Sequence, residues 1–61
     1  MSDYKTYYVE YVSKDGQYKV YRNKKTNCIV EFKNYDLALS IRNWFQAKSW
    51  CETAEIKEIY Y

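Results

Sequence analysis

The sequence predicts a small α+β domain: a three-stranded antiparallel sheet, one amphipathic helix packed on one face of the sheet, and a fourth strand at the C-terminus, in the order βββαβ. Three observations predict this class. Runs of aromatic and β-branched residues fill the first half of the chain, an apolar pattern with helical spacing follows, and the last residues return to strand-forming types. The 61 residues are expected to form one compact domain, 1–61, because so short a chain has room for only one core.

The first three strands follow from alternation and turn residues. Tyr4–Ser13 is rich in tyrosine and valine and predicts the first strand. Asp15-Gly16 holds the single glycine of the chain and favours a two-residue type I′ turn, because both central residues of that turn need positive φ. The second strand then covers Gln17–Arg22, and a third covers Cys28–Lys33 after a polar loop at 23–27.

The helix and the last strand come next. Asn34 is expected to cap the helix, and Asp36 lies in its first turn, where a negative charge suits the helix dipole. We expect the last strand, Thr53–Tyr61, to lie beside the first strand and parallel to it, through a right-handed crossover. The apolar stripe that faces the sheet is expected to consist of Leu37, Ala38, Ile41, Trp44, Phe45 and the stem of Lys48.

Nine tyrosines in 61 residues suggest a binding surface. With a two-residue turn, strand alternation sends Tyr11 and Tyr18 toward the helix, and Tyr8 and Tyr21 toward a sheet face that no second helix covers. Because tyrosine is enriched at interfaces, we expect this face to bind a protein partner or a second copy in a homodimer. The alternative is that cross-strand tyrosine pairs only stabilise the sheet. The expected partner-binding residues, on this face and on the outer side of the helix, are Tyr8, Val12, Lys19, Tyr21, Ile29, Leu39 and Trp50.

Nucleic-acid binding through the same sheet face is the second hypothesis. Basic residues alternate with tyrosines in the second strand and its loop, which combines attraction to phosphate with rings for base stacking. Glu10 and Glu31 on that face oppose a polyanion, and the formal net charge is only +2. The residues expected to contact nucleic acid are Lys19, Arg22, Lys24, Lys25 and Lys33.

The segment from Tyr7 to Trp44 resembles the three-strand-plus-helix modules of phage and transposon integrase amino-terminal domains, which lay their sheet in the major groove of DNA. The hairpin glycine Gly16 and the entry into the helix carry this resemblance, the latter through Phe32, Asn34, Asp36 and Ala38. The strands of this chain hold one arginine, and a further strand follows the helix, so the DNA-reading residues are not carried over.

Several classes of function are not expected. Histidine is absent, and no nucleophile–base grouping or glycine-rich phosphate loop is recognisable, so we expect neither an enzyme nor a cofactor. Cys28 and Cys51 are too few for a zinc site, and their placement leaves open whether they form a disulfide.

The expected location is the cytoplasm. No apolar stretch approaches the ~20 residues of a membrane span, and the first residues lack a signal-peptide pattern, so no membrane contact is expected. We therefore expect a non-catalytic stoichiometric inhibitor or adaptor, in the style of phage and mobile-element proteins.

Overall fold

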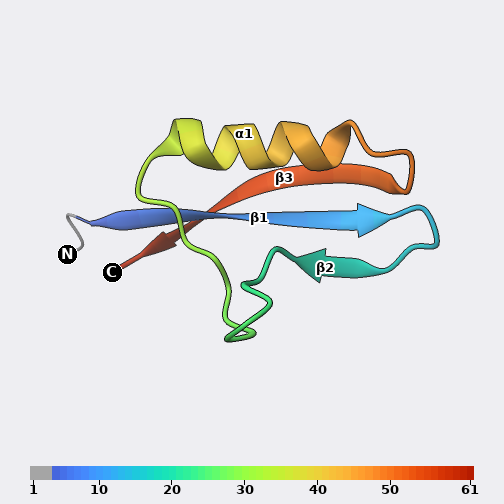
Figure 1. Ribbon diagram of the computed structural model, residues 1–61. Coiled ribbons are helices and arrows are strands. Elements are labelled where there is room, and N and C mark those ends of the chain that lie inside the picture. The colour runs from blue at the N-terminus through green and yellow to red at the C-terminus, as the bar shows by residue number, and fades with distance from the viewer. Residues whose placement is uncertain (1–3) are drawn as a thin grey trace.

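The computed structural model describes residues 4–61 and contains an antiparallel sheet with one helix packed on one face (Figure 1). The elements are β1 (Lys5–Ser13), β2 (Tyr18–Val20), α1 (Tyr35–Gln46) and β3 (Cys51–Tyr60). The strands lie in the order β2-β1-β3, and both pairs are antiparallel. The predicted α+β class, with its antiparallel sheet, single helix and C-terminal strand, is confirmed.

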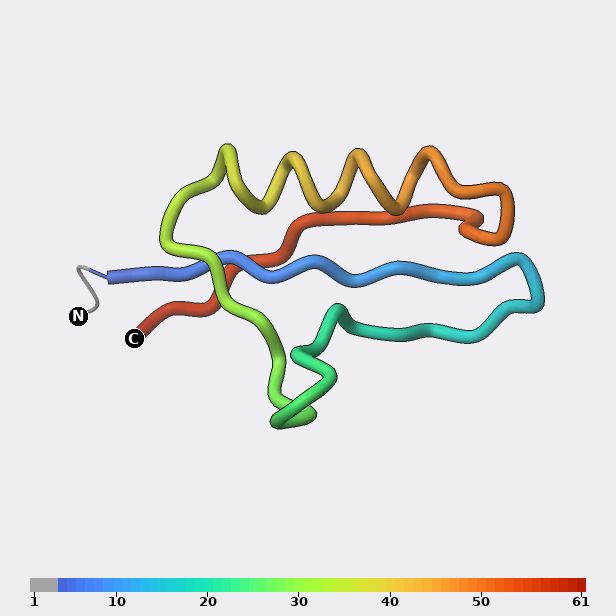
Figure 2. The backbone as a smooth tube through the Cα atoms, viewed as in Figure 1, coloured from blue at the N-terminus to red at the C-terminus, as the bar shows by residue number. Residues whose placement is uncertain are grey.

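The predicted third strand is not regular. Figure 2 shows residues 23–27 looping away from the sheet before the chain crosses toward the start of α1. Asn27 adopts a left-handed φ of 59° in this loop. Over Cys28–Lys33 the structure has two isolated bridges, Ile29 with Arg22 and Phe32 with Tyr7. The segment therefore divides its pairing between the end of β2 and the start of β1.

The prediction that the last strand runs parallel to the first is wrong. Phe32 pairs antiparallel with Tyr7, through hydrogen bonds of 2.8 and 2.7 Å, so the chain enters α1 beside the start of β1. The helix then runs in the direction of β1, and β3 returns antiparallel (Figure 1). Asn34 caps α1 as predicted, because its side chain accepts a hydrogen bond from the backbone N–H of Asp36.

The hairpin turn is one residue longer than predicted. The backbone N–H of Ser13 donates to the carbonyl of Gln17 at 2.9 Å, which leaves a three-residue loop between them. Gly16 ends that loop with φ +89°, in the region that favours glycine. One extra loop residue exchanges the two faces of β2, since side chains alternate along a strand. Val12 therefore pairs with Tyr18, and Tyr11 with Lys19.

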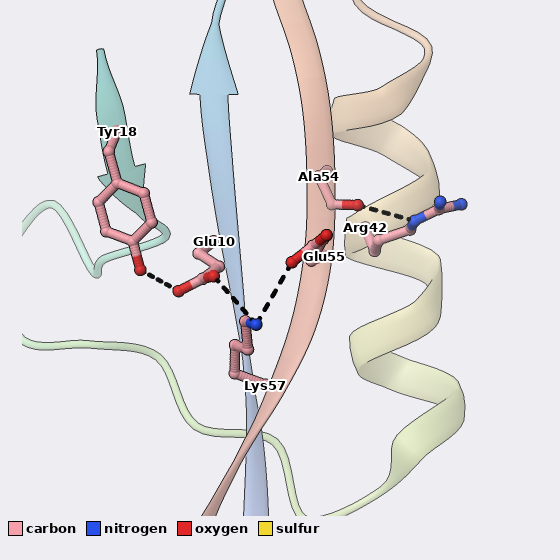
Figure 3. Close-up of polar contacts among 6 residues, drawn as sticks. All are labelled: Glu10, Tyr18, Arg42, Ala54, Glu55 and Lys57. Carbon is pink, nitrogen blue, oxygen red and sulfur yellow. Dashed lines mark hydrogen bonds and ion pairs between the residues drawn. The ribbon is translucent and has the colours of Figure 1, made fainter. Parts of the chain in front are cut away.

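The core lies between α1 and the β1–β3 half of the sheet. The buried residues are Val9, Ala38, Phe45, Cys51 and Ala54. α1 contacts β1 and β3, and Arg42 Nε donates to the Ala54 carbonyl at 3.1 Å from the helix side of β3 (Figure 3).

The predicted helix stripe is partly wrong. Ala38 and Phe45 are buried and Ile41 packs against them, but Leu37 is 56% exposed and Trp44 is 51% exposed. Because α1 packs on β1 and β3 and not on β2, no strand covers the Trp44 indole on the flank nearest β2.

Candidate functional site

The sheet face opposite α1, here called the uncovered face, carries Thr6, Tyr8, Glu10 and Val12 of β1 with the side chains paired to them. Figure 3 shows a polar chain across it. The Tyr18 hydroxyl donates to Glu10, and Lys57 bridges Glu10 at 3.6 Å and Glu55 at 3.3 Å. These charged groups interrupt the apolar residues of the face.

The polar chain alters two pKa values. The hydrogen bond to Glu10, with some desolvation, raises the pKa of the Tyr18 hydroxyl to about 12. The hydrogen bond and charge of Glu55 raise the pKa of Lys57. Both shifts favour the protonated forms, in which the Tyr18 hydroxyl donates to Glu10 and Lys57 carries its charge, so the centre of the uncovered face is polar.

The prediction that Tyr21 and Lys19 belong to the uncovered face is wrong, because the longer hairpin loop turns both toward the helix side. The Tyr21 ring lies 5.5 Å from the Phe45 ring, edge to face. Tyr18 lies on the uncovered face instead, 60% exposed, although two-residue turn geometry had placed it toward the helix.

The helix side of the sheet holds an open groove of about 660 Å³ between α1 and β2, here called the aromatic groove. Its floor is the Phe45 ring, stacked on Tyr11 with centroids 4.2 Å apart. Trp44 and Trp50 approach Phe45 edge to face, at 5.0 and 5.9 Å. The residues that line the groove are Tyr11, Tyr18, Lys19, Val20, Tyr21, Arg22, Lys24, Trp44, Phe45 and Trp50.

The groove is open because of where the helix lies. α1 packs on β1 and β3, so the part of the helix-side face next to β2 has no layer above it. Trp50 is held at one end of the groove, since its carbonyl accepts the backbone N–H of Lys14 at 3.0 Å. Two indoles, 51% and 45% exposed, therefore flank the opening.

Positive charge lines one side of the groove. Lys19, Arg22 and Lys24 belong to the lining, which includes no carboxylate. The Lys48 ammonium lies 4.2 Å from the centroid of the Trp44 ring. The sequence explains the imbalance, since no Asp or Glu occurs from Gly16 to Val30.

The predicted partner-binding residues divide among several surfaces. Lys19, Tyr21 and Trp50 come together in the aromatic groove. Tyr8 and Val12 are half-buried on the uncovered face. The other two lie elsewhere: Ile29 is 36% exposed beside Arg22, and Leu39 lines a second groove on the other flank of α1.

The predicted nucleic-acid residues are also divided. Lys19, Arg22 and Lys24 line the aromatic groove, whereas Lys25 and Lys33 do not. Five groove residues were not predicted from the sequence: Tyr11, Tyr18, Val20, Trp44 and Phe45. Of these, Trp44 was assigned to the core because its helical spacing fits the core stripe equally well. The sequence signal for a groove position was that Trp44 lies next to Phe45 and one helical turn before Lys48.

The second groove, of about 520 Å³, has polar groups that already pair with one another. Lys5 binds Glu58 at 2.6 Å, and Arg42 donates to the Ala54 carbonyl and to Asn43. Its lining therefore carries an internal ion pair, and the Arg42 guanidinium already donates to two acceptors of the chain. The aromatic groove is the better candidate for a binding site.

No cluster of three or more His, Cys, Asp or Glu residues suited to a metal ion occurs within residues 4–61. Both cysteines are free thiols, Cys28 exposed and Cys51 buried in the core. In the same part of the chain, no helix has the length and apolar character needed to cross a membrane. In comparisons with known proteins, the chain matches no protein-family model, no curated protein and no solved structure.

Proposed function

We propose that this chain is a non-catalytic protein-binding domain, acting as a stoichiometric inhibitor or adaptor in the cytoplasm, and that its contact surface is the aromatic groove. One observation carries the proposal: two half-exposed indoles flank a floor of packed rings, and basic residues lie along one side. Trp, Tyr and Arg are the residues that contribute most to protein–protein binding energy, especially around a well-packed centre.

The groove is preferred to the uncovered face for a physical reason. Docking an apolar partner on the uncovered face would desolvate Glu10, Lys57 and Glu55, and buried charges are costly unless fully paired. The groove presents rings, cations and Val20, and the cations can remain at its solvated rim. Self-association through the uncovered face would carry the same desolvation cost.

The test is affinity capture from a lysate of the source organism after nuclease treatment, with the wild-type chain and two variants. Trp44→Ala removes a groove side chain, and Leu37→Ala removes a similarly exposed apolar side chain of the same helix outside the groove. We expect a stoichiometric protein partner with the wild type and Leu37→Ala but not with Trp44→Ala. Equal capture by all three chains contradicts binding through the aromatic groove. Tyr8→Ala then tests whether the partner binds the uncovered face.

Nucleic-acid binding is the second candidate, and a specific observation favours it. Lys19, Arg22 and Lys24 lie in one groove with two exposed indoles, and phosphate attraction with base stacking is how many proteins bind single strands. This candidate predicts affinity for an oligonucleotide that falls steeply as salt rises. It also predicts weaker binding by Lys19→Glu, with Lys33→Glu, outside the groove, as the matched control.

A further inference from the structure

The outer edge of β2 lies beside the aromatic groove. β2 is the edge strand of the sheet, and its antiparallel ladder fixes which backbone groups face outward. The N–H of Ser13 donates to the Gln17 carbonyl, and the N–H of Tyr21 donates to the Val9 carbonyl, both at 2.9 Å. Every second residue from Gln17 to Tyr21 therefore forms its backbone hydrogen bonds with the β1 side of the hairpin. The positions between them, Tyr18 and Val20, direct their N–H and C=O groups away from β1.

The opposite edge of the sheet, on β3, is covered by helix side chains at Glu52 and Ala54. On β3, the N–H of Ala54 donates to Gln46 Oε1 at 3.1 Å, and the Ala54 carbonyl accepts from Arg42 Nε at 3.1 Å. The Glu52 carbonyl accepts from Gln46 Nε2 at 3.4 Å. Helix side chains thus occupy backbone groups to which an added strand would bind. The edge of β2 at Tyr18 and Val20, beside the groove, has no such cover from α1. Directly after β2, the carbonyl of Tyr21 already accepts the N–H of Val30, so the open edge is limited to β2 itself.

We infer that β2 and the aromatic groove together receive an extended, acidic segment of the protein partner, added to the sheet as a strand along β2. This inference rests on the proposed function and names the chemistry of the partner. Alternate side chains of such a strand project onto the helix side, where they meet Trp44 and Trp50. Carboxylates of the segment pair with Lys19, Arg22 and Lys24, because the lining contains no carboxylate. The Arg22 guanidinium donates one hydrogen bond to the Asn27 carbonyl, a neutral acceptor that leaves its charge without a counter-charge in the lining.

The first test is selection from a random peptide library displayed on phage, against the wild-type chain, with counter-selection on Trp44→Ala. Selected peptides are expected to be enriched in Asp and Glu and to alternate these with aromatic or aliphatic residues. Binding is read from the fluorescence of Trp44 and Trp50, the only tryptophans of the chain, both in the groove lining. Basic or uncharged selected sequences, or a library that yields no ligand, overturn the inference.

Backbone pairing has its own readout. Strand addition is expected to slow hydrogen exchange at the outward N–H groups, such as that of Val20, about tenfold or more when a selected peptide binds. Val20→Pro, which removes that N–H at an edge position, is expected to weaken peptide binding about fivefold to tenfold. Val20→Thr keeps the N–H and the β-branch and is the matched control. Unchanged exchange at Val20 with a bound peptide overturns strand addition.

The remaining outcomes separate this inference from the proposed function. If lysate capture depends on Trp44 but acidic peptides do not bind, the inference fails and the proposed function stands. If capture does not depend on Trp44, the proposed groove fails as well. If a 15-residue oligothymidylate changes the tryptophan fluorescence of the wild type and displaces a selected peptide, the groove is a nucleic-acid site and the inference is overturned.

Discussion

Gln46 fixes the end of α1 on β3, and removing its side chain tests how much these contacts stabilise the packing of the helix on the sheet. Its Oε1 accepts the N–H of Ala54, a residue only 2% exposed, and its Nε2 donates to the Glu52 carbonyl. Gln46→Ala deletes both hydrogen bonds. A buried donor left without a partner costs about 1–3 kcal/mol.

The expected loss lies at the lower end of that range. Gln46 is exposed, so water replaces part of the lost hydrogen bonding, and alanine favours the helix slightly. We expect the free energy of unfolding to fall by about 1 kcal/mol, which lowers Tm by about 4–8 °C in a domain of this size. For a small domain whose core supplies only ~3–5 kcal/mol, this is a large fraction of the stability.

Urea unfolding followed by circular dichroism measures the effect, and Gln46→Glu serves as the control. Glutamate keeps an acceptor for Ala54 but loses the donor to Glu52, whose carbonyl is on an exposed residue, so a smaller loss is expected. A change below about 0.3 kcal/mol in Gln46→Ala would refute the reasoning, because the bonds would then have no net role in holding α1.

Three further predictions concern the turn, the uncovered face and the core. Gly16→Ala is expected to cost about 1–2 kcal/mol in urea unfolding, from backbone strain alone, because an added Cβ meets nothing within 4 Å; equal stability contradicts the positive φ. The free energy of unfolding is expected to fall as pH rises from 10 to about 12, because in this range Tyr18 is deprotonated in the unfolded state but keeps its proton in the folded state. Tyr18→Phe should flatten this pH dependence. An unchanged slope in that variant refutes the hydrogen bond to Glu10. Phe45→Ala is expected to lose about 3–5 kcal/mol and leave the chain largely unfolded by circular dichroism, whereas Trp44→Ala should lose less than about 1 kcal/mol; similar losses would contradict their different burial.

The candidate site shows how far prediction from sequence reached. Trp50 was predicted as a partner contact, and Lys19, Arg22 and Lys24 were predicted as contacts to nucleic acid under the alternative hypothesis. All four line the aromatic groove, although they were not predicted to lie together. Tyr21 was assigned to the wrong face because the sequence Asp15-Gly16 fits a two-residue turn as well as the end of a three-residue loop. Trp44 was assigned to the core because helical spacing defines a stripe but not its exact width or tilt.

The sequence by itself determined the elements that depend on local physics: the first strand, the glycine turn, the Asn34 cap and the helix with Ala38 and Phe45 inward. Only the tertiary structure decided the register of β2, the direction of β3 and the lateral position of α1. Each of these depends on contacts between residues far apart in the chain, such as Phe32 with Tyr7 and Phe45 with Tyr11. A one-residue shift or a displaced helix leaves the local pattern unchanged, so the aromatic groove exists only once those distant pairs have formed.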